Sequence, residues 1–291
     1  MYSCGSEDFP ETILTKANVL DEFQKDFYQR CGSDSEVTYA DYDGNCVNIE
    51  FVDPAGHSGR VIYQDGEWQM TAREYARDQF LDLPDLVLAT FNKMSNGLEA
   101  PIAFFGKREG IMEFSRRGIE DTYYQFTFYT DLGPNHVGTH SAVIDENGNL
   151  IDHVKSDYNS LARTVGFDDL LGFIRERYQG CDVRALVNDD GTDVFFIFHD
   201  GVQKRVEFKN AYQPYQSADD WYGTSWPIDR SAVPEYVWDE FKARCEKDVR
   251  DGYYEPTQFY YKETPQMNLF GLSGPVSETT TVTNWFAERS L

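Results

Sequence analysis

Histidine is the side chain most often used for metal binding or acid–base chemistry near neutral pH. The chain contains five histidines: His57, His136, His140, His153 and His199. His136 and His140 are four residues apart, but the nearby Pro134 and Gly138 break any helix there. On an extended strand this spacing separates the two side chains by about 13 Å, too far for one shared metal ion. His199 precedes an Asp-Gly pair and is read as a hairpin corner. We therefore predict no metal site.

Clustered acidic residues offer two other kinds of chemistry, calcium binding and hydrolysis by a carboxylate pair. The stretch 145–149 begins like a calcium loop (Asp-x-Asn-x-Asn), but Leu150 stands where that loop needs glycine and no glutamate stands at its twelfth position. We read it as a turn. The acidic stretch 189–193 is read in the same way, although it could bind calcium weakly. Among 50 Asp and Glu residues any two carboxylates could meet, so a hydrolase with a carboxylate pair stays an alternative.

No sequence motif points to a specific enzyme class. The chain has no Gly-x-Ser-x-Gly elbow, phosphate-binding loop, dinucleotide fingerprint or His-Glu-x-x-His motif. We therefore assign no catalytic residue and no cofactor, and expect a protein that is not an enzyme.

Aromatic residues in and near loops are a better functional lead. Exposed aromatic side chains are typical of binding hot spots. The alternative is that many of these rings cover the edges of the core and expose only their polar tips. The candidate binding residues are Tyr123, Tyr212, Tyr215, Tyr222, Trp226, Tyr253 and Tyr254.

Composition limits the classes of partner. The chain has 291 residues, 41% of them hydrophobic, which is enough for packed cores. Its formal charge of -24 repels phosphate backbones and anionic lipids, so we expect no nucleic acid and no membrane contact through basic patches. No run of about 18 apolar residues is present, so no spanning helix is predicted. Basic partners and uncharged glycans remain possible ligands.

The first ten residues form a separate leader. Small residues lead to Cys4, which an acidic segment follows, and this resembles a bacterial lipoprotein processing site of the kind common in Bacteroidetes. The resemblance implies that Cys4 is acylated and that the protein is anchored by this lipid in the periplasm or at the outer-membrane surface. The alternative is an ordinary cysteine in a frayed terminus.

The other four cysteines show no metal-binding spacing. They allow three disulfide pairings, and we interpret them first as small buried hydrophobic residues and second as a possible disulfide. These residues are Cys31, Cys46, Cys181 and Cys245.

The hydrophobic pattern predicts four similar units, each a helix followed by antiparallel strands. Apolar residues recur at helical spacing over about 20–31, 83–94, 167–178 and 233–245. Between these stretches the period is two, with Asp-Gly and Asn-Gly pairs at hairpin turns. Asp82 is expected to cap the second helix, with Pro84 in its first turn. The fold class is therefore α+β, built from tandem helix-plus-antiparallel-sheet repeats in two pairs.

One pattern recurs in the first and third units. Trp68 is followed three residues later by Thr71, and Trp221 is followed in the same way by Thr224. A Leu-Pro or Val-Pro pair then opens the next helix, at 83–84 and 233–234. A sheet that ends in Trp and leads into a helix that starts with proline is thus used twice.

The helix, the antiparallel meander, the Asp-Gly-Glu-Trp turn at 65–68 and the Leu-Pro pair together resemble the PepSY-like family related to β-lactamase-inhibitor protein. Membership would imply a first domain at 11–158, with repeats at about 11–80 and 81–158, and a second at 159–291, with repeats at about 159–227 and 228–291. It would also imply an exported, non-catalytic protein whose sheet face holds a protein or peptide of the cell envelope, in an inhibitor-like role. A surface glycan-binding lipoprotein is the alternative within binding.

Overall fold

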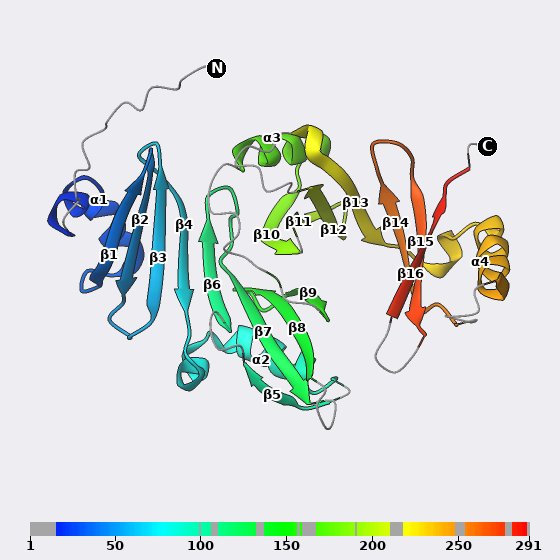
Figure 1. Cartoon of the computed structure of the whole chain (residues 1–291), viewed down its shortest axis with the longest axis horizontal. Helices are drawn as coiled ribbons and strands as arrows, with labels where there is room; N and C mark the ends of the chain where they lie inside the picture. The colour runs from blue at the N-terminus through cyan, green and yellow to red at the C-terminus, as the bar shows by residue number, and fades with distance from the viewer. Residues whose placement is uncertain are drawn as a thin grey trace, which may run out of the picture.

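The chain folds into two antiparallel sheets with helices along their faces, arranged along one long axis (Figure 1). The computed structural model describes residues 16–98, 100–105, 110–131, 137–155, 158, 167–189, 191–209, 218–247, 254–276 and 281–289. In this part the chain has four α-helices and sixteen strands. The predicted α+β class is confirmed in outline, and strands dominate it.

The first sheet contains nine strands. Its order is β1-β2-β3-β4-β6-β7-β8-β9, with β5 beside β7. Because β4 pairs with β6, the first two helix-plus-strand units share one continuous sheet. The elements are α1 (Lys16–Cys31), β1 (Glu36–Asp43), β2 (Cys46–Val52), β3 (Ser58–Gln64), β4 (Glu67–Glu74), η1 (Arg77–Asp82), α2 (Asp85–Ser95), β5 (Ile102–Phe105), β6 (Ile111–Arg116), β7 (Tyr123–Asp131), β8 (Val137–Asp145) and β9 (Leu150–Val154).

The second sheet contains seven strands in sequence order, from β10 to β16. Here β13 pairs with β14, so the third and fourth units also share one sheet. The elements are α3 (Asp168–Arg177), β10 (Asp182–Asp189), β11 (Thr192–His199), β12 (Val202–Lys209), η2 (Ala218–Asp220), β13 (Trp221–Pro227), η3 (Arg230–Ala232), α4 (Glu235–Lys247), β14 (Gln258–Glu263), β15 (Leu269–Pro275) and β16 (Thr281–Ala287).

Three small cores lie where α1, α2 and α4 cover their own strands. On α1, Phe27 meets Phe51 of β2 with ring centroids 5.6 Å apart. On α2, Phe91 stacks on Phe126 of β7 at 4.3 Å. On α4, the fully buried Phe241 belongs to a cluster with residues of β15 and β16. These aromatic contacts add a favourable ring geometry to the burial of apolar area.

The largest core joins the two sheets. It combines Phe114 and Val143 from the helix-free side of the first sheet with Leu171 of α3 and Phe195 of β11, all fully or almost fully buried. Both faces of the central strands are therefore covered.

The predicted hairpin turns are present. Asp65 and Gly66 have φ of 53° and 79°, and Asp200 and Gly201 have φ of 54° and 76°. Positive φ at both central residues fits the right-handed twist of the flanking strands.

The repeated Trp-x-x-Thr pattern is a repeated structural feature. The indole N–H of Trp68 donates to Thr71 Oγ1 at 2.9 Å, and that of Trp221 donates to Thr224 Oγ1 at 3.1 Å. A guanidinium group from the end of the preceding helix also lies over each indole. In the first unit this group belongs to Arg30, whose Cζ atom is 3.9 Å from the centroid of the Trp68 ring. In the third unit that residue is Arg177, at 4.2 Å.

The start of α2 differs from the prediction. Asp82 ends the 3-10 helix η1 instead of capping α2, and α2 begins at Asp85 with Pro84 as the residue before it. The two extended residues between η1 and α2 turn the chain into the second unit.

Candidate functional site

The structure places the predicted binding residues in different environments. The residues outside the described part are Tyr212, Tyr215, Tyr253 and Cys4. Tyr254 is 5% exposed, and its hydroxyl donates to the main-chain carbonyl of Leu272 at 3.1 Å. Trp226 packs on Tyr261 on the helix side of β13 and β14, whereas Tyr222 is 45% exposed. Tyr222 is therefore the described candidate with an exposed ring.

The surface location predicted for Tyr123 is wrong. Its side chain is 0% exposed and lies in the core between the sheets. Its hydroxyl accepts from Arg116 Nε at 2.7 Å and donates to the carbonyl of Leu186 at 2.8 Å. The second sheet covers the side of β7 that would otherwise face water, so this tyrosine joins the two sheets.

Replacing Tyr123 with phenylalanine should lower the free energy of unfolding by about 2 kcal/mol, because buried donors and acceptors lose their partner while ring packing is kept. Urea unfolding followed by tryptophan fluorescence measures the loss. Tyr39→Phe is the control, since Tyr39 is 52% exposed. Equal stability of the two variants would contradict a bridging role for the Tyr123 hydroxyl.

The exposed ring of Tyr222 belongs to the helix-free face of the second sheet, defined here by Arg205, Glu207, Tyr260, Lys262 and Trp285. Residues directly opposite each other in antiparallel strands point to the same side. Arg205 and Lys262 both oppose Ser225, and Tyr260 and Trp285 both oppose Gly271. The Lys262 ammonium lies 4.3 Å from the Tyr222 ring, which places that ring on the same face.

Two side chains of the helix-free face lie flat on the sheet. A Cβ atom at Gly223 would come within 2.6 Å of Lys262 Cε, and one at Gly271 within 2.7 Å of the Trp285 ring. Glycine is therefore required at both positions for this close approach. The result is a partly exposed aromatic surface formed by Tyr222, Tyr260 and Trp285.

A charged network supports this surface from the side of the first sheet. Arg205 contacts Glu207 at 2.8 Å and Asp189 at 2.6 Å. It also donates to the hydroxyl of Tyr158 at 2.9 Å, and that hydroxyl donates to Asp152 of β9 at 2.6 Å. The network thus joins β9 of the first sheet to β12 of the second.

The two carboxyl groups at the ends of this network have pKa values shifted in opposite directions. Burial raises the pKa of Asp152 above its usual value, against the hydrogen bond from Tyr158 and the charge of Arg205. Burial also acts to raise the pKa of Glu207, but Arg205 and Lys262 outweigh it and hold that pKa below its usual value. Opposed shifts are typical of an acid–base pair. Here, however, each carboxylate is already bound by neighbouring donors, as a structural network requires.

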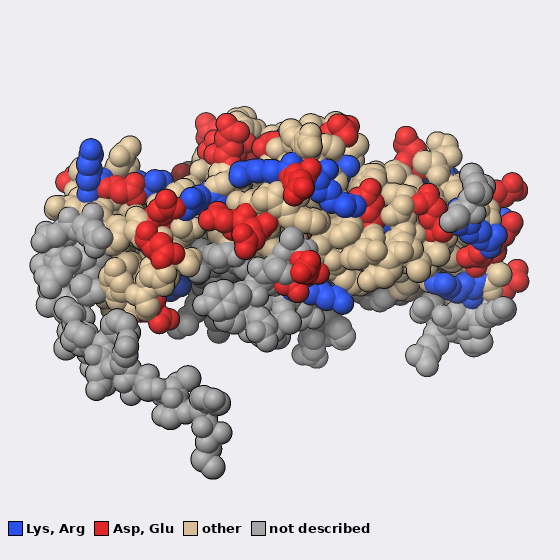
Figure 2. Space-filling view, turned by 90° about the horizontal axis from the view of Figure 1, so that it is seen from above, with Lys and Arg blue, Asp and Glu red and all other residues tan. Residues whose placement is uncertain are grey.

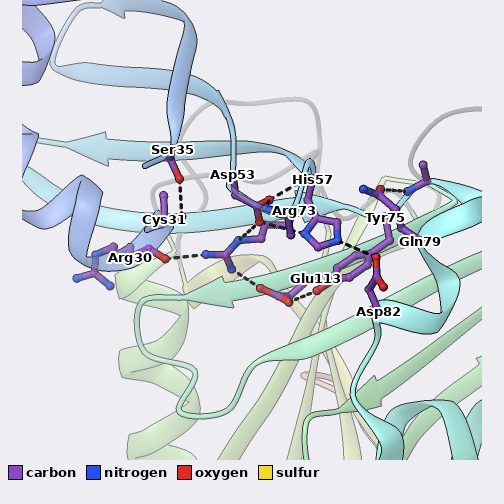
Figure 3. Close-up of polar contacts among 12 residues, drawn as sticks. Arg30, Cys31, Ser35, Asp53, His57, Arg73, Tyr75, Gln79, Asp82 and Glu113 are labelled. Carbon is purple, nitrogen blue, oxygen red and sulfur yellow. Dashed lines mark hydrogen bonds and ion pairs between the residues drawn. The ribbon is translucent and has the colours of Figure 1, made fainter. Parts of the chain in front are cut away.

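A second polar cluster, which we call the seam, lies between the cores of α1 and α2 (Figure 3). Arg73 of β4 pairs with Glu113 of β6 and donates to the carbonyl of Arg30 at 2.6 Å. Glu113 also accepts from the hydroxyls of Tyr75 at 2.8 Å and Tyr124 at 3.2 Å. Every polar group named here is therefore engaged, and the seam connects α1, β4, β6 and β7.

His57 lies at the edge of the seam. Its Nδ1 is 3.0 Å from Asp53 Oδ2, and its Nε2 has no hydrogen-bond partner among the described groups and is 3.8 Å from Asp82 Oδ2 (Figure 3). Burial acts to raise the pKa of Asp53, but hydrogen bonds from His57 and Ala55 outweigh it and lower that pKa. Asp53 thereby closes the β2–β3 turn.

Two of the four cysteines fit the first interpretation, because Cys46 and Cys181 are only partly buried. Cys31, Cys46, Cys181 and Cys245 are free thiols, and Cys31 and Cys245 are buried. Burial raises the pKa of the Cys31 thiol to about 12, so this thiol is an inert part of the core.

One histidine pair was not foreseen. His140 of β8 and His153 of β9 stack with Nδ1 and Nε2 3.1 Å apart, and His140 Nε2 lies 3.2 Å from Thr130 Oγ1. Burial lowers the pKa of His153. The register of β8 and β9 brings the two imidazoles together, and the sequence alone does not show that register. Across the described residues, no group of three or more His, Cys, Asp or Glu residues is placed to hold a metal ion.

The surface carries charged side chains of both signs. Acidic and basic side chains are interspersed along the face seen from above, although the net charge is -24 (Figure 2). Among the described helices, none combines the length and the apolar character needed to cross a bilayer.

Comparisons with known proteins give partial likenesses. No family model matches the chain, so the expected PepSY-like membership has no such support, and no curated protein matches it. A BLIP-like protein from Bacteroides fragilis is similar in structure, with 14% identity and a TM-score of 0.34 over 46% of this chain and 84% of that one. A putative periplasmic protein from Bacteroides eggerthii is similar with 14% identity and a TM-score of 0.32 over 46% and 86%. At these values the function has to be argued from the chain's own residues.

Proposed function

We propose that this protein is a non-catalytic binding protein whose helix-free face holds a protein or peptide of the cell envelope. The observation that carries the proposal is the partly exposed aromatic surface of Tyr222, Tyr260 and Trp285, in which the Trp285 ring lies against Gly271. Rigid aromatic side chains supply contact area at a low cost in conformational entropy. The charged network beside these aromatic residues holds the underlying strands in place before a partner binds. Such preorganisation favours affinity.

Affinity capture from the envelope of the cell that makes the protein tests the proposal. Tyr222→Ala and Trp285→Ala should each reduce recovery of the captured protein by at least about tenfold, as expected for a hot spot. Tyr39→Ala is the matched control, because Tyr39 is exposed on the first sheet, far along the chain from this surface. Equal recovery with all three variants would overturn the proposal.

Two other functions have distinct outcomes. Glycans that raise the thermal unfolding midpoint, by mass action on the native state, would favour a surface glycan-binding protein. Turnover of a substrate that disappears in Asp152→Asn or Glu207→Gln would favour a hydrolase, since the pKa values of these two carboxyl groups are shifted in opposite directions.

The proposal includes domain boundaries and a location. We propose domains at 11–158 and 159–291, each holding two helix-plus-strand units, because strand pairing runs through β4–β6 and through β13–β14. A lipid on Cys4, in the periplasm or at the outer-membrane surface, completes the proposal. Mass spectrometry of the protein purified from membranes tests the lipid.

A further inference from the structure

A groove of about 560 Å³ lies beside α1, apart from the helix-free face, and we call it the α1 groove. Its walls come from α1, the β3–β4 hairpin and the turn after β6. The lining residues are Phe23, Asp26, Arg30, Tyr63, Gly66, Glu67, Trp68 and Arg117. This volume falls in the range of ordinary ligand pockets.

The third unit shows what occupies the equivalent place in its own repeat. Arg177 covers Trp221 as Arg30 covers Trp68, so the two helices can be aligned on these arginines. Four residues before Arg177 stands Phe173, whose ring lies 5.7 Å from that of Trp221. In the third unit a phenyl ring therefore lies beside the indole that Arg177 covers, and Trp221 is only 9% exposed.

Among the described residues of the first unit, no phenyl ring stands in that place. Asp26 stands four residues before Arg30, and its carboxylate accepts from Arg30 Nε at 2.8 Å and from the Tyr63 hydroxyl at 2.9 Å. Tyr63 opposes Trp68 in the hairpin as Phe208 opposes Trp221. The polar pair Asp26 and Tyr63 thus stands where the third unit has the Phe173–Phe208 contact, whose centroids are 5.7 Å apart. The Tyr63 ring stacks instead on Phe23, with centroids 4.3 Å apart.

The acceptor for the second arginine nitrogen also differs between the two units. In the third unit Arg177 Nη2 donates to Glu263 of β14 at 3.1 Å, and Glu263 opposes Thr224. The residue that opposes Thr71 in the same way is Ser115 of β6, which has no carboxylate. Among the described residues, the α1 groove therefore has no aromatic ring in the place that Phe173 has beside Trp221. Asp26 accepts from Arg30 Nε, but no described oxygen accepts from the Arg30 Nη atoms in the way that Glu263 accepts from Arg177 Nη2.

We propose that the α1 groove binds an aromatic side chain of a partner polypeptide, with its ring beside Trp68 and a neighbouring main-chain carbonyl accepting from an Nη atom of Arg30. The ring takes the place that Phe173 has in the third unit, and the carbonyl oxygen takes the place of the Glu263 oxygen. The Arg30 guanidinium and the Asp26 carboxylate neutralise each other, so the groove selects for shape and hydrogen bonding more than for charge.

The probe is N-acetyl-phenylalanine amide, which carries one phenyl ring and two carbonyl groups. Added to the full chain at millimolar concentration, it should move the indole N–H signal of Trp68 in an NMR titration that saturates. Trp68→Phe assigns that signal among the five tryptophans. N-acetyl-alanine amide, which lacks the ring, should leave the signal in place. No saturable movement with the phenylalanine probe would overturn the proposal.

The matched variant copies the third unit into the first. Asp26→Phe combined with Tyr63→Phe places the Phe173–Phe208 pair in the groove, so binding of the probe should weaken by at least about tenfold. The unfolding midpoint should rise by about 2 °C or more, because the groove is filled. Asp26→Asn keeps the groove open and should keep the binding. If the double variant does not fold, Asp26→Leu fills the same space and serves in its place.

Unchanged binding of the probe to a folded filled variant would overturn the proposal. Trp285→Ala should leave the Trp68 titration unchanged. Failure at the groove is therefore distinguishable from failure at the helix-free face.

Discussion

Replacing Arg73 with methionine is expected to lower the free energy of unfolding by about 3 kcal/mol, because it leaves the largely buried Glu113 carboxylate without its cation. The side chains of Arg73 and Glu113 are 18% and 11% exposed, so water only partly replaces the lost pair. Arg73 also holds the end of α1 through the carbonyl of Arg30, and that contact is lost as well (Figure 3). Urea unfolding at neutral pH, followed by tryptophan fluorescence, measures the change.

The neighbouring strands provide a matched control. Arg60 of β3 pairs with Glu50 of β2 at 3.0 Å, but these side chains are 38% and 40% exposed. Arg60→Met should cost at most about 1 kcal/mol, as exposed ion pairs generally do. Similar costs for the two arginines would show that the seam contributes no more than a surface pair.

A double substitution separates the pair from the rest of the seam. Arg73→Met with Glu113→Met should cost less than the sum of the two single changes, because neither charge is then left buried alone. The hydroxyls of Tyr75 and Tyr124 lose their acceptor in the double variant, so part of the cost remains. Additive costs would show that Arg73 and Glu113 act independently.

Helices and hairpins could be read from the sequence because their causes are local. The helix of Phe23, Phe27 and Cys31 follows from three-to-four spacing, and the turn at Asp65-Gly66 follows from the tolerance of glycine for positive φ. The repeated Trp-x-x-Thr pattern could be found for the same reason, since its hydrogen bond spans three residues.

The burial of both faces of β7 could not be predicted from the sequence. Tyr124, Phe126 and Phe128 mark its helix side, as the period of two predicts. Tyr123 and Gln125 on the other side have the polar character of a solvent-exposed face, yet both are buried. The side-chain amide of Gln125 donates to the carbonyl of Tyr158 at 2.7 Å. Alternation identifies two faces, but a second sheet packed on the polar face leaves no periodic signal.

The aromatic surface could be predicted only in part, for a related reason. The spacing of Tyr260 and Lys262 places them on one side of a strand. Their neighbours Tyr222 and Trp285 come from other strands, and the pairing of β13, β14, β15 and β16 decides that they meet. Such pairing depends on contacts between distant segments, which composition and period do not encode.

Replacing Arg205 with methionine should have an effect as large as that of Arg73→Met, about 3 to 5 kcal/mol at pH 7, because one cation serves several carboxylates. Arg205 lies 2.6 Å from Asp189, 2.8 Å from Glu207 and 3.9 Å from Asp152. Arg230→Met is the control, since Arg230 and its partner Glu255 are 63% and 58% exposed. A cost no larger than that of the control would contradict a structural role for the network between the sheets.

The cost of Arg205→Met should shrink as the pH falls toward 4.5. In the wild type the pKa of Glu207 is below its unfolded value of about 4.3, so its pairing stabilises the fold above that pH and is lost as the pH falls through the folded pKa. Without Arg205 the buried carboxylates should take up protons more readily than in the unfolded chain, so the variant gains stability between pH 7 and pH 4.5, where the wild type still keeps the pairing of Glu207. Asp152 has a raised pKa already in the wild type and adds less to the difference. Urea unfolding of both proteins at pH 7 and pH 4.5 measures the difference in their free energies of unfolding. A difference that is the same at both pH values would exclude a charge-based effect.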